Sequence, residues 1–209
     1  STVTHPDSRQ GRFCVITASG IGRRMGGPKA LLLWNDKIPL VVAHARARLT
    51  DCEATIVVAR QSIAEKLRPL GAELSIVVSD APDDWGPAGS IYALAQSGRI
   101  SQARELLIGP VDMPPLSHSS LVPLFVALSD SVNAVRPVFA SRGGHPVLVR
   151  ASVILNHYQQ HAPSLRDVLR SLGPGFVDAQ VDDPDVLVDL DTPDAFKNRL
   201  GREPAFWIG

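Results

Sequence analysis

Cysteine is scarce in this chain, with only Cys14 and Cys52 among 209 residues. Two cysteines cannot build the disulfide framework of a small secreted domain, and they supply no zinc-ligand cluster. Long apolar runs are also missing, because the longest, at 38–43, is far shorter than the roughly 20 residues that span a bilayer. No N-terminal segment combines a basic patch with an apolar core, so we expect no secretory signal, no membrane partner and a cytoplasmic location.

Neither sign of charge is in excess, and aromatic residues are few. Lys and Arg together number 21, as do Asp and Glu, so the formal net charge is zero. Non-specific binding to nucleic acid depends on a surplus of cations, so we expect no nucleic-acid partner. Aromatic residues make up 5% of the chain, and its three tryptophans are too scattered to define a patch. The 44% hydrophobic and 20% charged residues are typical of a globular domain.

What the sequence does contain is a regular succession of apolar strands. Segments with helical spacing lie between most of these runs, at 40–48, 63–70 and 121–128. This alternation predicts a mostly parallel sheet covered by helices on both faces, that is, a single Rossmann-like three-layer α/β domain. The polar residues 1–10 lack periodicity, so we expect a flexible leader there and one domain over 11–209. The expected strands lie at 13–17, 54–59, 74–78, 106–111, 132–139, 146–149 and 186–190.

The first strand ends in the most informative segment of the chain. Gly20 and Gly22 let backbone N–H groups approach an anion without obstruction by a Cβ atom. Arg24 and Lys29 place two cations close to the same point. Ligands of open α/β sheets bind beyond the carboxyl ends of the strands, so this composition predicts a polyphosphate site.

Two familiar phosphate motifs do not match this loop. A dinucleotide-binding Gly-x-Gly-x-x-Gly that begins at Gly20 would need a third glycine where Met25 stands. A P-loop needs Gly before its lysine and Ser or Thr after it, whereas Pro28 and Ala30 flank Lys29. A glycine-rich turn with incidental surface arginines is the remaining alternative to a phosphate site.

A carboxylate follows a later strand. Asp112 comes after the apolar run 106–111 and precedes Met-Pro-Pro, which cannot start a helix at once. An aspartate at a strand end can be a helix cap or a turn former. It is also the natural hard-oxygen ligand for Mg²⁺ on triphosphate oxygens.

A second acidic segment starts at Asp80, after the third apolar run. Gly86 and Gly89 flank the expected start of a helix, where small residues can admit a flat base or reacting phosphates. A solvated acidic turn capped by Asp83 or Asp84 is the alternative.

At these positions the sequence resembles the nucleoside-triphosphate transferases. Their pattern Leu-Ala-Ala-Gly-x-Gly-x-Arg-Met-Gly-x-x-Lys is matched over 17–29, with Thr17 in place of Leu and Ser19 in place of the second Ala. Asp-Met-Pro at 112–114, Gly-His-Pro-Val-Leu at 144–148 and Asp-x-Asp-Thr-Pro at 189–193 follow in the family's order. The segment at 86–89 is similar to Gly-Pro-x-Ala-Gly of molybdopterin guanylyltransferases, with one residue missing. Gly-His-Pro-Val-Leu is similar to the cytidylyltransferase branch of the molybdenum-cofactor enzymes.

The resemblance implies a nucleotide-diphospho-sugar transferase-like fold and a Mg²⁺-dependent nucleotidyltransferase. The enzyme would move CMP or GMP from CTP or GTP to the phosphate of molybdopterin or molybdenum cofactor and release pyrophosphate, with a client molybdoenzyme as an open further partner. The implied catalytic residues are Arg24, Lys29 and Asp112. The implied nucleotide-binding residues are Thr17, Ala18, Ser19, Gly20, Gly22, Lys29, Asp80, Gly86 and Gly89. The implied acceptor-binding residues are His145, Asp189 and Asp191, and the implied metal ligands are Asp112 and Asp191.

Three questions stay open at the level of sequence. A carboxylate at Asp80 would pair with the N1–H and amine donors of guanine, whereas the Gly-His-Pro-Val-Leu segment favours CTP by resemblance. Either Asp189 or Asp191 can complete the metal site, although Asp191 or Thr192 can equally cap the last helix. The acceptor can be a sugar-1-phosphate or another small phosphate, and a non-catalytic nucleotide- or cofactor-binding chaperone remains an alternative.

Overall fold

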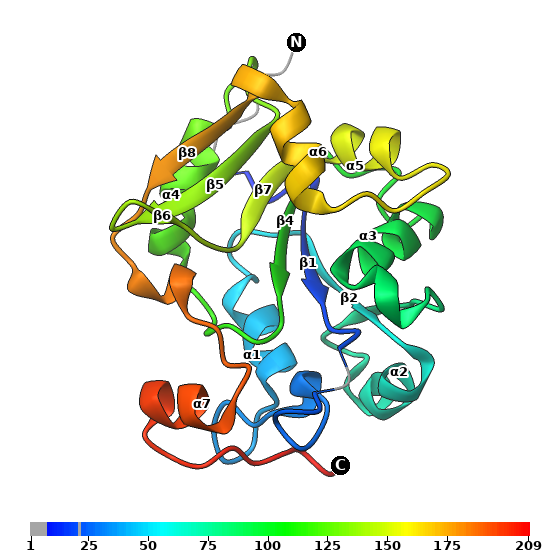
Figure 1. The fold of residues 1–209 in the computed structure, drawn as a ribbon, viewed down its shortest axis with the longest axis vertical. Coiled ribbons are helices and arrows are strands. Elements are labelled where there is room, and N and C mark those ends of the chain that lie inside the picture. Colours follow the sequence, from blue (N-terminus) through cyan, green and yellow to red (C-terminus); the bar gives the residue numbers. More distant parts are fainter. Residues whose placement is uncertain (1–7, 21) are drawn as a thin grey trace.

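The computed structural model describes residues 8–20 and 22–209, and Figure 1 shows the arrangement of its elements. The sheet has the strand order β3-β2-β1-β4-β7-β5-β6, and β8 pairs with β5. The strands are β1 (Arg12–Thr17), β2 (Ala54–Ala59), β3 (Ser75–Val78), β4 (Glu105–Pro110), β5 (Ala134–Phe139), β6 (Arg142–Gly143), β7 (Val147–Arg150) and β8 (Phe176–Gln180). The α-helices are α1 (Leu40–Ala47), α2 (Gln61–Leu67), α3 (Pro87–Gln96), α4 (His118–Ala127), α5 (Ala151–His157), α6 (Leu165–Ser171) and α7 (Pro193–Leu200).

The sheet is mostly parallel, which confirms the predicted fold class. β1 pairs in parallel with β2 and β4, β2 pairs in parallel with β3, and β5 pairs in parallel with β8. β7 is antiparallel to both β4 and β5. The short connection through β6 accounts for the β5–β7 pair, because neighbouring strands joined by a short turn can only run in opposite directions.

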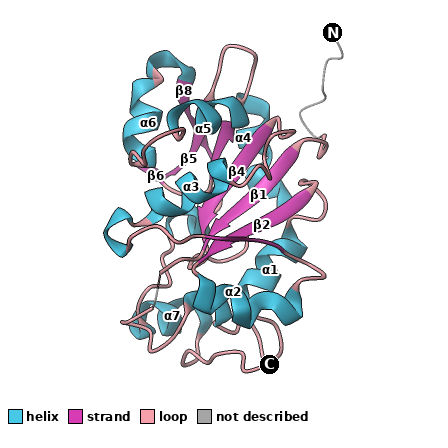
Figure 2. Cartoon of the chain, turned by 90° about the vertical axis from the view of Figure 1, so that its right-hand side faces the viewer, coloured by secondary structure: helices cyan, strands magenta, loops and turns pink. Residues whose placement is uncertain are grey.

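Helices cover both faces of the sheet and enclose two apolar cores (Figure 2). On one face, side chains of α1, α2, α4 and α7 pack against the sheet, with Leu40, Leu124 and Phe196 fully buried. On the other face, α3, α5 and α6 contribute Leu94, Ile154 and other buried residues. Both faces of the central strands are therefore removed from water, which explains their continuous apolar runs. Within the described ranges, no helix is long and apolar enough to cross a bilayer.

The predicted strand at 186–190 is wrong. Residues Pro184–Leu187 form a 3-10 helix, and the chain then continues to α7 without pairing as a strand. Val186 and Leu190 are nevertheless 1% and 0% exposed, so core burial rather than strand pairing produces the apolar pattern. The position beside β5 is taken by β8, which was not predicted, and neither were the helices α5 and α6. Most of the predicted leader 1–10 lies outside the described residues. Of the rest, Ser8 accepts a hydrogen bond from the domain and Arg9 donates one to it.

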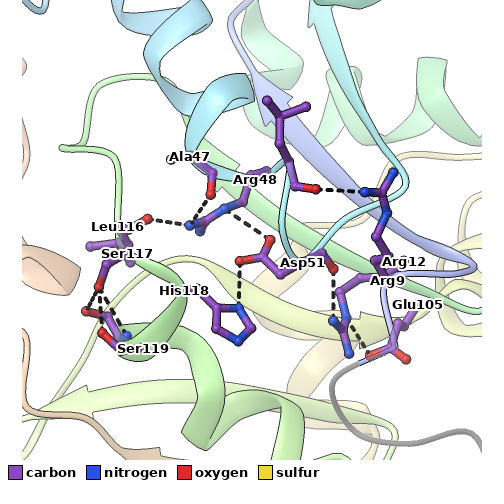
Figure 3. A network of polar contacts seen from close by, with 12 residues as sticks. Arg9, Arg12, Ala47, Arg48, Asp51, Glu105, Leu116, Ser117, His118 and Ser119 are labelled. Atoms are coloured by element: carbon purple, nitrogen blue, oxygen red, sulfur yellow. Dashed lines mark hydrogen bonds and ion pairs between the residues drawn. The ribbon is translucent and has the colours of Figure 1, made fainter.

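Charged side chains are buried at the amino ends of the strands (Figure 3). The Asp51 side chain is fully buried; it forms an ion pair with Arg48 at 3.3 Å, and His118 Nδ1 lies 3.2 Å from it. Arg12 donates to the Asp51 carbonyl at 2.9 Å, and its guanidinium lies 3.7 Å from the centre of the Phe125 ring. This network joins β1, the turn after α1 and α4 at the end of the sheet opposite the cleft described next.

Candidate active site

The carboxyl ends of the adjacent parallel strands β3, β2, β1 and β4 border a cleft of about 920 Å³. β1 leads into the glycine-rich loop, β2 into Arg60, β3 towards Asp80 and β4 towards Asp112. Parallel strands direct their carboxyl ends to one edge of the sheet, so segments far apart in the sequence meet there. Figure 1 shows the arrowheads of β1 and β4 pointing to the end of the molecule where α7 lies. The predicted residues that line the cleft are Thr17, Ala18, Ser19, Gly20, Lys29, Asp80, Gly86 and Asp112.

The glycine-rich loop folds back on itself after β1. Gly22 has a φ angle of +68°, and a Cβ atom there would lie 1.8 Å from the carbonyl oxygen of Gly27. Only glycine therefore fits this position without moving the backbone. The N–H groups of Met25 and Gly26 both donate to the Gly22 carbonyl at 3.0 Å. The fold-back brings the start of the loop next to the segment that carries Lys29.

The two departures from the family pattern both have structural partners. Thr17 is the last residue of β1, and its carbonyl accepts the Val111 N–H at 3.2 Å. Ser19 Oγ lies 2.6 Å from Ser90 Oγ in the first turns of α3. The Ser19 hydroxyl thus ties the glycine-rich loop to the helix that forms the neighbouring wall of the cleft.

Lys29 and Asp112 meet across the cleft. Lys29 begins a short 3-10 helix (Lys29–Leu31), and its Nζ donates to Asp112 Oδ2 at 2.7 Å. The side chains are 20% and 15% exposed, so the pair is accessible to a ligand yet partly shielded from water. The main chain of Asp112 is fixed as well, because its carbonyl accepts the Leu190 N–H at 2.6 Å.

Two further carboxylates approach from the segment before α7. Burial and the nearby carboxylates of Asp112 and Asp191 raise the pKa of Asp189 to about 6. Its carboxyl group lies within hydrogen-bonding reach of Asp112. Asp191 instead accepts a hydrogen bond from Arg24 at 2.7 Å. Asp112 is therefore paired with a cation and also has a second acidic group nearby.

The Asp112–Asp189 pair has the donor chemistry of a divalent-cation site. Two contacting carboxylates repel one another when both are ionised, and this repulsion contributes to the raised pKa of Asp189. A hard cation between them would relieve it, and Mg²⁺ typically takes one or two protein carboxylates together with substrate phosphate oxygens. In residues 8–20 and 22–209, no group of three or more His, Cys, Asp or Glu side chains is arranged to hold a metal. The residues fit an ion whose coordination a phosphate ligand would complete.

Six of the predicted residues do not line the cleft. Two of them, Asp189 and Asp191, approach Asp112 and Arg24 from the segment before α7, as described above. Gly22 lies within the folded loop, and the Arg24 side chain, 68% exposed, turns to Asp191. Gly89 is buried, and a Cβ atom there would lie 2.8 Å from Ala81 Cβ, so it permits close packing of α3. His145 is exposed as a whole residue. The surrounding protein still shields its ring from part of the solvent, which lowers its pKa, and the Asp112 carboxylate opposes that shift.

A second cation in the cleft, Arg60, was not predicted from the sequence. Its Nε donates to the Ser19 carbonyl at 2.7 Å, and its Nη2 lies 2.7 Å from Asp83 Oδ1. It links the glycine-rich loop to the acidic turn after β3, and Gln61 and Ser62 beside it also line the cleft. Arg60 follows directly after an apolar strand, so the strand-end rule that selected Asp112 would also have selected it.

Comparison with known proteins agrees with this arrangement. Residues 14–175 match the sequence profile of the MobA-like NTP transferase domain. The chain is 24% identical over 184 residues to the molybdenum cofactor cytidylyltransferase of Escherichia coli (strain K12), which covers 88% of this chain and 92% of that protein.

Solved structures show the same fold. The crystal structure of the Mycobacterium tuberculosis Rv0371c homologue from Mycobacterium sp. strain JC1 matches with a TM-score of 0.73 and 26% identity, covering 93% of this chain and 97% of that one. The manganese complex of Rv0371c from Mycobacterium tuberculosis H37Rv matches with a TM-score of 0.69 and 20% identity, over 91% and 98% of the two chains. Since the profile match extends over most of its length, this chain belongs to the family of MobA-like NTP transferase domains.

Proposed function

We propose that this protein transfers a nucleoside monophosphate, CMP by preference, from a nucleoside triphosphate to the phosphate of a molybdopterin-type acceptor, with release of pyrophosphate. The observation that carries the proposal is the Lys29–Asp112 pair, at 2.7 Å, inside a cleft of about 920 Å³ next to the glycine-rich loop. Membership of a nucleotidyltransferase family supports the reaction class.

In the proposed reaction, an oxygen of the acceptor phosphate attacks the α-phosphorus of the triphosphate. The bond between the α-phosphorus and the bridging oxygen breaks, and that oxygen leaves with pyrophosphate. Catalysis of this type needs in-line positioning and neutralisation of charge rather than a covalent nucleophile. An acceptor phosphate is already ionised at neutral pH, so no general base is required.

The chain's own residues would divide these tasks. Lys29 would neutralise charge on the triphosphate, and the backbone N–H groups around Gly20 would hold its β- and γ-phosphates. Arg24 lies outside the cleft and is paired with Asp191. We therefore propose one of two roles for Arg24. It either leaves Asp191 to bind the phosphates when a triphosphate enters the cleft, or it holds Asp191 in place.

Asp112 and Asp189 are the proposed ligands of a divalent cation, Mg²⁺ by expectation. Such an ion would supply charge neutralisation at the phosphate oxygens. Asp189 replaces Asp191 in this proposal because Asp189 is the carboxyl group within hydrogen-bonding reach of Asp112. The manganese in the related Rv0371c structure supports a divalent ion in this fold.

The choice of base depends on two side chains that line the cleft. Asp80 could accept from the N1–H and amine donors of guanine, whereas Arg60 offers N–H donors to O2 and N3 of cytosine. The cytidylyltransferase relative in Escherichia coli favours CTP. A cytoplasmic location and a client molybdoenzyme remain expectations of the same proposal.

The direct test is pyrophosphate release with Mg²⁺ and each of CTP, GTP, ATP and UTP, with and without molybdenum cofactor as the acceptor. We expect a signal that depends on the cofactor and is strongest with CTP. A stronger signal with GTP would overturn the choice of base. A signal with a sugar-1-phosphate alone would overturn the acceptor, and nucleotide binding with no turnover on any phosphate would favour the non-catalytic alternative.

A further inference from the structure

The last residues of the chain pack against the glycine-rich loop. We name residues 202–207 the C-terminal strap. The Leu33 N–H donates to the Ala205 carbonyl and the Trp207 N–H to the Leu31 carbonyl, both at 2.8 Å. Leu32 and Phe206 form an antiparallel bridge between these two bonds. The strap therefore pairs, strand-like, with the residues that directly follow Lys29.

The Phe206 ring lies against the loop at Gly27. A Cβ atom on Gly27 would lie 2.9 Å from Cε1 of this ring, closer than real Cβ contacts come, and 3.0 Å from Cζ. The Gly27 carbonyl in turn occupies the space beside Gly22. The Phe206 ring therefore packs against Gly27, and Gly27 packs against the folded-back part of the loop at Gly22.

The loop and the residues that follow it are also contacted from both ends of α7. Asp191, just before that helix, accepts a hydrogen bond from Arg24 at 2.7 Å. Arg202, just after it, donates to the Leu33 carbonyl at 2.7 Å and lies 5.1 Å from the centre of the buried Phe196 ring. Both contacts come from beyond residue 175, where the match to the family profile ends.

We infer that Phe206 is a positioning residue: its ring sets the place of Gly27 and, through it, of the loop and Lys29. The inference rests on the proposed function, because it assigns to the strap the task of holding the loop ready for a nucleoside triphosphate. A loop fixed in its binding conformation before the ligand arrives avoids the cost of ordering it on binding. Without the ring, nucleotide binding would have to order the loop.

The test compares Phe206→Ala, Phe206→Tyr, Gly27→Ala and the Gly27→Ala/Phe206→Ala double variant. The control is Ile208→Ala, since Ile208 is 96% exposed two residues further on. We expect Phe206→Ala to raise KM for the nucleotide about tenfold with less than about a threefold change in kcat. Phe206→Tyr, which keeps the ring, and the control should retain the wild-type KM.

Gly27→Ala tests the same contact from the other side. The added methyl group would overlap the ring, so this variant alone should also raise KM about tenfold. Removal of the ring makes room for the methyl group, so the double variant should be no worse than Phe206→Ala. A KM for Phe206→Ala equal to the wild type, or multiplicative effects in the double variant, would overturn the inference.

Hydrogen exchange separates this inference from the proposed function, because it needs no substrate. The Met25 and Gly26 amides, both bonded to the Gly22 carbonyl, should exchange faster in Phe206→Ala, while the β1 and β4 amides should not change. Unchanged exchange of these two amides would overturn the role of Phe206 even in an active enzyme. Faster exchange in a protein that binds no nucleotide would uphold it while the proposed function fails.

Discussion

Lys29 and Asp112 compensate each other's charge at 2.7 Å in a cleft that is otherwise accessible to ligands. A lysine near phosphates and a carboxylate near a metal have different tasks in the proposed reaction. Substitution of each one should therefore affect a different measured quantity, and two predictions follow from this difference.

Asp112→Asn should lower kcat by about a hundredfold or more, because the amide keeps the shape of the side chain and removes its charge. The measurement is steady-state pyrophosphate release, with a thermal melt of each variant to show that the fold is kept. Asp130→Asn, at an exposed position, is the matched control. Wild-type turnover by Asp112→Asn would remove this residue from the catalytic machinery.

Lys29→Ala should weaken binding of the triphosphate about tenfold or more, since one charge-assisted contact with phosphate is lost. Titration calorimetry with CTP measures this directly, and binding of CMP should weaken less because it lacks the β- and γ-phosphates. Lys37→Ala, which removes an exposed lysine, serves as the control. Equal CTP affinity in Lys29→Ala and the wild type would contradict the role given to Lys29.

Single residues also show the limit of sequence reasoning. Asp112 and Lys29 were predicted because each has a distinctive neighbour sequence, Met-Pro-Pro in one case and the glycine pattern in the other. Arg60 also follows an apolar strand directly, but no motif surrounds it, so its position at the strand end alone did not single it out. Its partners, the Ser19 carbonyl and Asp83, lie 41 and 23 positions away and meet it only in the folded chain.

Whole elements were predicted where burial on both faces of the sheet leaves a continuous apolar run, as in β1, β2 and β4. The segment 186–190 has a similar composition but no strand beside it, so its apolar residues fill the core from a 3-10 helix and an extended connection. β8 has the burial pattern of a half-exposed strand and lacks such a run. Strand pairing depends on the partner strand, which a local pattern does not contain.

The buried network at the amino ends joins several elements, so its loss should lower stability. Asp51→Ala would leave the buried Arg48 guanidinium without its ion-pair partner. We expect a loss of about 3–5 kcal/mol in the free energy of unfolding. Urea denaturation of this variant and of Asp130→Ala, an exposed control, measures the difference. A loss below about 0.5 kcal/mol, the range of an ordinary surface substitution, would contradict the structural role of the network.

The stability of the whole molecule should depend on pH through His44 in α1. Its Nε2 lies 3.0 Å from the Val111 carbonyl beside the cleft, and burial lowers its pKa from 6.5 to about 4. The folded chain then keeps the ring neutral where the unfolded chain binds a proton. The stabilisation that the neutral ring gives to the folded chain is therefore present in full above pH 6.5. It is lost as the pH falls towards 4. The loss in the free energy of unfolding is at most about 3 kcal/mol, because the ring keeps some solvent contact.

His44→Gln isolates this effect, because the amide can still donate to the Val111 carbonyl and does not titrate. The free energy of unfolding, from urea denaturation at pH 7.5 and at pH 4.5, should fall less in the variant than in the wild type. Carboxylates contribute equally to both proteins, so the difference reports the histidine. An equal fall in both would show that the pKa of His44 is the same in the folded and the unfolded chain, and would contradict the role of burial.

The measurement that tests nucleotidyl transfer most directly follows the two ends of the triphosphate separately. CTP labelled at the α-phosphorus or at the γ-phosphorus is incubated with the full-length protein, Mg²⁺ and molybdenum cofactor, and the products are separated. Attack at the α-phosphorus predicts α-label in the modified cofactor and γ-label in pyrophosphate, with both signals lost in Asp112→Asn. Appearance of γ-label in inorganic phosphate or on the cofactor, with no α-label transferred, would contradict nucleotidyl transfer.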